Sequence, residues 1–341
     1  MNTKTSTGSP APADSDSASA SAEPGRGRGL RLGGMNWLVW RQHRAAYWTL
    51  VAAAAVTVVF IVYERHQMMT YLDGYGWPHL KSGWEDRLNH RTLDMAGLVI
   101  GYMPILIGVF VGAPLLAGDL ESGTAKLVNS QSASRVRWLA TKLGVTALVV
   151  VVSTTAVSVA FGWWWSPIKT SSYIFSWIEG PAFDNTGPVP AALTLLSVVG
   201  GVAIGMLLRR TLMSMVVTFG FAVAVQVAWS QARMSLGDVL TVTSDQGVGE
   251  NSAPAVPEGA HIVDQSYLTS SGDLIGWGSC AEATEKATAA CLDKAQVVGW
   301  GIEYIPISQM PSMQWLGASL LLALTAAIAA FVILRGRKRL V

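Results

Sequence analysis

The sequence predicts an all-α membrane protein with six transmembrane helices and both termini in the cytoplasm. Hydrophobic residues make up 51% of its 341 residues and charged residues only 13%, well below the roughly 25% charged residues of a soluble domain. Several windows of about 20 residues lack Asp, Glu, Lys and Arg, and a helix of that length crosses a bilayer core. The basic residues are concentrated in alternate connecting segments, which sets the orientation.

The predicted spans contain almost no ionisable side chain. They cover residues 45–63, 96–117, 139–163, 188–208, 211–229 and 314–334. Pro104 and Pro114 lie inside the second span, and Lys142 is close enough to the end of the third to snorkel. No Asp or Glu lies in any span, whereas ion-coupled carriers usually need such residues near the midplane. We expect Gln226, in the fifth span, to make an interhelical hydrogen bond.

Lys and Arg counts place both termini inside. With a cytoplasmic amino terminus, the inner segments hold 16 of the 24 basic residues on much less connecting chain than the outer side. The division into regions follows: a disordered cytoplasmic tail at 1–34, an interfacial amphipathic helix at 35–44, spans one to five at 45–229, an extracellular loop or cap at 230–313, and the last span with a basic cytoplasmic tail at 314–341.

The segment 35–44 has the composition of a helix lying in the membrane interface. Trp37 and Trp40 share one helical face, and Arg41 and Arg44 share the adjoining one. Such a helix places its rings at headgroup depth and its guanidinium groups near lipid phosphates. An ordinary basic flank of the first span is the alternative.

The outer loop contains both cysteines of the chain, Cys280 and Cys291, and residues 279–298 look helical. Eleven residues of continuous helix span roughly 16 Å, whereas a disulfide needs Cα atoms about 4.4–6.8 Å apart. A bridge therefore requires the segment to bend. We expect a bend and a disulfide, because disulfides persist outside the cell.

The sequence lacks the motifs of an enzyme. It has no G-x-x-x-x-G-K-[ST] phosphate loop, no H-E-x-x-H and no G-x-S-x-G. His66, His79 and His90 share the first outer loop, but their spacing matches no familiar set of metal ligands. We therefore expect neither catalysis nor a metal site.

The connection between the second and third spans is the most informative stretch. Leu120, Leu127 and Val128 have the spacing of one helical face, and Asp119 and Glu121 precede the basic residues as the helix dipole favours. A short amphipathic helix that offers an apolar ridge to a partner fits this pattern. A capped turn fits it equally well on composition alone.

The run DLESGTAKLVNSQSASRVRWLATK resembles the cytoplasmic loop of the ABC-2 type permease subunits of bacterial ABC exporters. In that family an acidic residue precedes Gly-Thr, and a Ser/Thr-Arg element leads into the third span. The matching residues are Glu121, Gly123, Thr124, Ser134, Arg135 and Lys142. The layout of six spans with a large outer loop before the last is also similar. The chain departs from the pattern at Gly118-Asp119 and in its longer outer loop.

The resemblance implies an ABC-2 type permease architecture with a large outer loop between helices five and six, in a multi-pass protein of the bacterial plasma membrane. It implies export of a hydrophobic or amphipathic substrate by a pair of permeases. A separate cytoplasmic ABC ATPase would bind ATP and Mg²⁺, while this chain binds no cofactor. Its other partners would be a second copy and membrane lipid, with no nucleic acid. The implied ATPase-coupling residues are Asp119, Leu120, Glu121, Gly123, Thr124, Leu127, Val128 and Arg135.

A second function from another class is compatible with the sequence. The chain would then be a non-transporting membrane sensor or immunity protein that binds a ligand through its extracellular loop. Co-purification with an ABC ATPase favours the exporter, and binding of an extracellular ligand by the isolated chain favours the sensor.

The distribution of basic residues predicts the topology. Reporter fusions placed after Arg210 and after Val341 should give a cytoplasmic signal, and a fusion at Ser270 should give an external signal. A cytoplasmic signal at Ser270 is incompatible with the arrangement of six spans.

Overall fold

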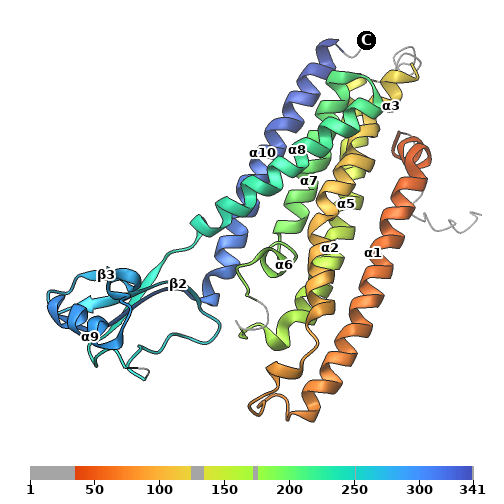
Figure 1. Ribbon diagram of the computed structural model, residues 1–341. Helices are drawn as coiled ribbons and strands as arrows, with labels where there is room; N and C mark the ends of the chain where they lie inside the picture. Colours follow the sequence, from red (N-terminus) through yellow and green to blue (C-terminus); the bar gives the residue numbers. More distant parts are fainter. Residues whose placement is uncertain (1–34, 124–133, 172–175, 250, 340–341) are drawn as a thin grey trace, which may run out of the picture. The chain divides into compact units, whose positions relative to one another are not determined.

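Six long helical segments form most of the structure (Figure 1). This computed structural model describes residues 35–123, 134–171, 176–249 and 251–339. The long segments are α1 (Met35–Gly74), α2 (Arg91–Ile107) with its continuation α3 (Ala113–Glu121), α5 (Arg135–Trp165), α7 (Val189–Leu208), α8 (Thr211–Ala232) and α10 (Met310–Arg339). Each is long and apolar enough to cross a membrane. The prediction of six such helices is therefore confirmed.

Short helical turns occupy several of the connections. They are η1 (Glu85–Arg87), η3 (Ser166–Ile168), α6 (Gly180–Phe183), η4 (Arg233–Leu236), η5 (Trp277–Cys280) and η6 (Ile307–Gln309). The predicted tail at 1–34 lies outside the described residues.

Helix α1 runs without a break from Met35 to Gly74, so the predicted interfacial helix and the predicted first span form one helix. Trp37 is 47% exposed, and the guanidinium of Arg41 lies 5.1 Å from the centre of its ring. The Trp40 ring packs against Tyr47 at 5.4 Å. Arg44 is exposed. The first turns of α1 therefore carry the aromatic and basic side chains that an interfacial position requires.

The second membrane segment changes its helical geometry in the middle. Between α2 and α3, residues Gly108–Gly112 form a π-helical turn, η2. Pro104, one turn earlier, has no N–H for an i→i−4 hydrogen bond, and Pro114 lies in the first turn of α3. Single π turns interrupt α-helices at kinks and are frequent at functional sites.

Helix α7 is the centre of the bundle. In the most apolar 18-residue stretch of α7, 72% of the residues are buried, whereas the corresponding stretches of α1 and α8 are each only 17% buried. It contacts α2, η2, α3, α5, α8 and α10. An apolar helix that is buried on all sides has no polar face, and α7 has no charged residue between Val189 and Leu208.

Glycines allow the backbone of α7 to come into direct contact with the backbones of η2 and of the start of α3. A Cβ atom added to Gly112 would lie 2.6 Å from the carbonyl oxygen of Val198, and one added to Gly205 would lie 2.6 Å from that of Ala113. Heavy atoms that are not bonded cannot approach so closely. Small residues at helix crossings are the usual source of close packing in membranes, where lipid offers no hydrophobic driving force.

The segment between α8 and α10 folds as a β-sheet, so the all-α prediction is wrong for this part of the chain. Its strands are β1 (Leu240–Ser244), β2 (His261–Thr269), β3 (Leu274–Gly276) and β4 (Val297–Ile305), in the antiparallel order β1-β4-β2-β3. The strands are rich in Val, Ile, Thr, Tyr and Trp, which favour extended backbone. Gly272, at φ +88°, forms the tight turn between β2 and β3.

Cys280 and Cys291 form a disulfide with Cα atoms 5.6 Å apart. The bend that this distance requires is present, because helix α9 (Glu285–Lys294) covers only part of the predicted helical segment. The Thr284 hydroxyl caps α9 by accepting a hydrogen bond from the N–H of Ala287 at 3.3 Å. Cys280 lies before this cap, in η5, and so can fold back onto Cys291.

The close packing of η2 on α7 predicts unequal effects of two identical substitutions. Gly112→Ala forces a methyl group against the Val198 carbonyl and should destabilise the protein by about 1–3 kcal/mol. Gly144→Ala, in the exposed middle of α5 with no atom near the added methyl, should be neutral or slightly stabilising. Thermal unfolding of both variants in detergent measures the difference. Equal melting temperatures would mean that α7 and η2 can separate freely.

Candidate functional site

The predicted coupling residues lie where α3 ends and α5 begins, which we call the loop end of the bundle. Asp119, Leu120 and Glu121 form the last turn of α3, and Gly123 follows with φ +73°. Arg135 is the first residue of α5 and is exposed. Thr124, Leu127 and Val128 lie outside the described residues.

Asp119 is buried, with 7% of its surface exposed, so it does not belong to the exposed surface of the loop as predicted. One carboxylate oxygen accepts a hydrogen bond from the ammonium group of Lys142, and the two side chains form an ion pair. The other accepts one from Nε2 of Gln42 at 2.7 Å. Both oxygens of the carboxylate are thus satisfied inside the protein.

Lys142 is fully buried, so the prediction that it snorkels to the interface is wrong. Besides Asp119, its ammonium group donates to the carbonyl oxygen of Leu115 at 3.1 Å and lies 4.8 Å from the centre of the Trp138 ring. A buried cation needs a counterion and hydrogen-bond acceptors, because desolvation alone costs several kcal/mol. Asp119 and the Leu115 carbonyl, both on α3, meet these two requirements.

The same cluster holds the first turns of α1. Gln42 reaches Asp119 on α3, and one turn later the Tyr47 hydroxyl is 2.8 Å from Oγ1 of Thr146 on α5. Tyr47 and Thr146 are both buried. Polar contacts in a low-dielectric interior are stronger than in water. The loop end of α1 is therefore attached to both helices that flank the predicted coupling loop.

Glu121 connects the end of α3 to the start of α8. Its Oε2 atom accepts a hydrogen bond from the backbone N–H of Thr211 at 2.8 Å. Thr211 begins α8, where the N–H groups have no helical partner and the helix dipole favours a negative charge. The chain enters α8 from α7 through Arg209, which is left-handed at φ 56°, and Arg210.

Leu120 packs against the apolar cluster at the loop end. The cluster consists of Leu115, Leu116, Trp138, Leu139, Val202, Ala203, Met206 and Val332, from α3, α5, α7 and α10. Leu120 is thus partly buried among these helices. A displacement of the last turn of α3 would therefore disturb its packing against α5, α7 and α10.

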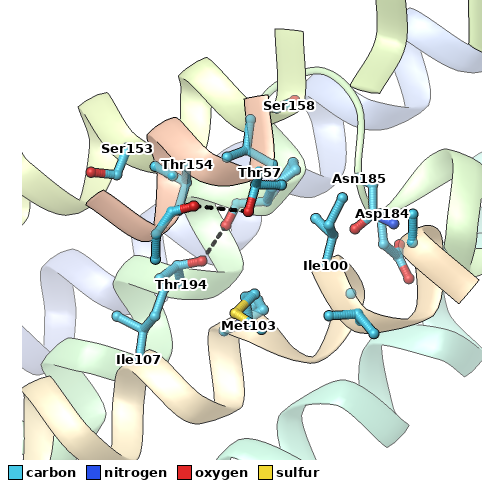
Figure 2. Close-up of a pocket in the computed structure, with 18 of the residues that line it drawn as sticks. Thr57, Ile100, Met103, Ile107, Ser153, Thr154, Ser158, Asp184, Asn185 and Thr194 are labelled. Carbon is cyan, nitrogen blue, oxygen red and sulfur yellow. Dashed lines mark hydrogen bonds between the residues drawn. The ribbon is translucent and has the colours of Figure 1, made fainter. Parts of the chain in front are cut away.

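A cavity of about 470 Å³ lies between α1, α2, α5 and α7 (Figure 2). Most of its lining is apolar, and the hydroxyls of Thr57, Thr154 and Thr194 bond to carbonyl oxygens of their own helices. The wall therefore presents mainly methyl and methylene groups. The Ser153 hydroxyl is buried and has no hydrogen-bond partner within the described segments. Pockets of about 300–1,000 Å³ with apolar walls are typical of small-molecule sites.

Asp184 and Asn185, between α6 and α7, line the end of the cavity that faces away from the loop (Figure 2). Asp184 accepts hydrogen bonds from Nη1 of Arg233 at 2.7 Å and Nε1 of Trp229 at 2.6 Å. Asn185 donates to the carbonyl oxygen of Gly97 on α2 at 2.6 Å. Burial raises the pKa of the Asp184 carboxyl, and the charge of Arg233 opposes this rise.

Two further amides join helices in this region. Gln314 of α10 donates from Nε2 to the carbonyl oxygens of Phe183 and Thr186, both at 3.0 Å. Gln226 of α8 donates to the carbonyl oxygen of Gly101 on α2 at 2.9 Å, so the predicted interhelical hydrogen bond is confirmed. Asp184 was not singled out from the sequence, and Gln314 was named only as the first residue of the last predicted span. Their hydrogen-bond partners are distant in the chain, so the sequence does not indicate the pairing. The one usable signal was that both are polar residues at or beside the end of a predicted span.

The buried ion pair predicts a non-additive response to substitution. Lys142→Met leaves the Asp119 carboxylate buried without its cation, and Asp119→Leu leaves the ammonium group without its counterion. Each should destabilise the protein by about 3–5 kcal/mol, whereas the double variant should be much closer to the parent. Thermal unfolding and membrane abundance of the four proteins test this. Additive losses would show that the two charges act independently.

Comparison with known proteins identifies the chain. A family model described as "ABC-2 membrane transporter related" matches residues 51–233, which is more than half of the sequence. Comparison with curated proteins and with solved structures gave no match. With six helices of membrane-spanning length among the residues that the structure describes, the chain is a multi-pass membrane protein. The match agrees with the resemblance seen in the connection between the second and third spans, and the chain belongs to the family described as ABC-2 membrane transporter related.

Proposed function

We propose that this chain is the membrane subunit of an ATP-driven exporter in the bacterial plasma membrane. Two copies of it would work with a separate cytoplasmic ABC ATPase, which binds ATP and Mg²⁺. The substrate is hydrophobic or amphipathic and leaves the cell. Family membership favours transport over the alternative of a non-transporting sensor or immunity protein.

One observation carries the proposal: the loop between α3 and α5 is attached through its two ends to four membrane helices. Asp119 and Lys142 join α3 to α5, Gln42 joins α1 to α3, and Glu121 joins α3 to α8. A partner that displaces the loop therefore acts on all four helices together. This is the mechanical connection that a permease without its own ATPase needs.

The transport step is conformational. The permease has two arrangements, and ATP-driven closure of the ATPase pair changes which one is populated. The buried ion pair makes separation of α3 from α5 costly, so these helix ends move as a unit. The π-helical turn η2, between α2 and α3, is the point in the second span at which such a movement is absorbed.

The cavity supplies the substrate site of this scheme. It lies between α1, α2, α5 and α7, and α1, α5 and the α2–α3 span are among the segments connected to the loop. Movement at the loop end thus changes the separation of the cavity walls. The apolar lining suits the apolar part of a substrate that enters from lipid.

Leu127→Asp tests the coupling loop. If Leu127 inserts into an apolar groove of the ATPase, a carboxylate at this position would be buried there without a partner, which abolishes docking. The tagged chain is purified from its native membranes, and the eluate is assayed for ATP hydrolysis and for a protein with a G-x-x-x-x-G-K-[ST] motif. We expect both to be lost, at normal membrane abundance of the variant.

Glu121→Ala is the milder comparison in the same loop, because it removes the hydrogen bond to α8 and leaves Leu127 unchanged. Glu121 is exposed, so its removal should weaken coupling less than Leu127→Asp does. Retention of the ATPase and of transport by Leu127→Asp would show that the loop is only a turn between two spans, and the proposal would fail with it.

A further inference from the structure

A second, polar cavity lies beside the apolar one. It measures about 230 Å³ and is enclosed by α1, the residues that lead into α2, and the end of α5 with η3. Glu64, Gln67, Asn89 and His90 supply carboxylate, amide and imidazole groups to its wall. This lining contrasts with the methyl and methylene groups of the larger cavity.

The two cavities adjoin. Thr92 lines both of them, and α1, α2 and α5 contribute walls to both. Phe60 of the apolar cavity packs edge-on against Trp164 of the polar one, with ring centres 6.3 Å apart. The two cavities are therefore neighbours that meet at Thr92 and at the contact between Phe60 and Trp164.

The polar cavity carries negative charge. Among the described residues that line it there is no Lys or Arg, and Glu64 forms no ion pair in the described part of the chain. Arg65, its neighbour, stacks on the Trp163 ring at 4.0 Å and does not line the cavity. Asp94, 3.8 Å from His90, adds a second carboxylate nearby.

Aromatic rings complete this wall. Trp164 and Tyr71 line the cavity, and the Tyr71 hydroxyl is occupied by a hydrogen bond to the carbonyl oxygen of Trp84 at 2.8 Å. Aromatic faces together with a carboxylate form the surroundings in which proteins bind ammonium groups. An anionic head would meet Glu64 instead and be repelled.

The apolar cavity is open toward the lipid side of the bundle. Val56 of α1 and Val99 of α2, on its two walls, are 70% and 58% exposed. An alkyl chain can enter between these helices without crossing the polar groups at Asp184. Its head would then reach the polar cavity beyond Thr92.

We propose that the two cavities form one binding site for an amphiphile with an apolar chain and an ammonium head. The chain occupies the cavity of about 470 Å³, and the head lies near Glu64 between Tyr71 and Trp164. This assignment rests on the proposed function, since it names the class of substrate for that transport site.

The test measures binding by the purified full chain in maltoside micelles, without any ATPase. The probe is tetradecyltrimethylammonium with a photoreactive diazirine in its chain, compared with tetradecyl sulfate carrying the same group. We expect saturable crosslinks of the ammonium probe to α1 and α2, located by mass spectrometry, and at least about tenfold weaker binding of the sulfate, since one charge contact of this kind is worth about a factor of ten.

Substitutions separate the roles of the two cavities. Glu64→Gln should weaken binding of the ammonium probe about tenfold and strengthen binding of the sulfate, because it removes the charge that repels the sulfate, and Glu64→Lys should favour the sulfate further. Glu282→Gln, at an exposed position outside both cavities, is the control for charge.

Ala54→Trp, which fills the apolar cavity, should abolish binding of the probe, whereas Ala55→Trp, its exposed neighbour outside the lining, should not.

Thermal unfolding confirms that each variant is folded before binding is compared. Equal binding of the two probes by the parent protein, or unchanged binding by Ala54→Trp, overturns this inference and leaves ATPase-driven export intact. Selective ammonium binding in a chain that neither transports nor retains an ATPase supports the site and contradicts the proposed function instead.

Discussion

The backbone contact between α7 and the π-helical turn η2 is the constraint on which the rest of the bundle depends. Lipid is as apolar as leucine, so helices in a membrane gain little from hiding apolar side chains from it. Close van der Waals contact has to hold them together. Gly108, Gly112, Gly201 and Gly205 remove the side chains that would keep the two backbones apart. Once α7 is fixed against the second span, its remaining faces are available to α5, α8 and α10.

Polar interactions join the helices to one another at both ends of this bundle. At the loop end, a fully buried cation is held by Asp119 and the Leu115 carbonyl. At the opposite end, Asp184, Asn185 and Gln314 join the segment before α7 to α8, α2 and α10. Separating a buried charge from its partner costs several kcal/mol of free energy, whereas moving the two together keeps their interaction. In the proposed transport step, both ends would therefore shift as connected units.

The sequence was sufficient for the spans and insufficient for the contacts between them. Windows without charge predicted six helices because a helix in lipid must satisfy every backbone group internally. The β-sheet was missed because it lies in a polar region outside the predicted spans, although the Val, Ile and aromatic content of the nine-residue strands β2 and β4 was a usable signal. Asp119 was assigned to the loop surface because the predicted second span stopped at Ala117. A lone lysine in the next span, Lys142, could have suggested a buried acidic partner.

Helix α1 connects the loop to the cavities. It packs mainly on α5, and its apolar window is among the least buried of the six. It also lines both cavities, opposite α2. Its loop end is held by Gln42 on Asp119 and by Tyr47 on Thr146, next to the segment that a cytoplasmic partner would contact. Because α1 packs largely on α5, in the proposed transport step a displacement of α5 at the loop would carry α1 with it relative to α2. In that step the width of the cavities would depend on the same few polar contacts that hold the loop.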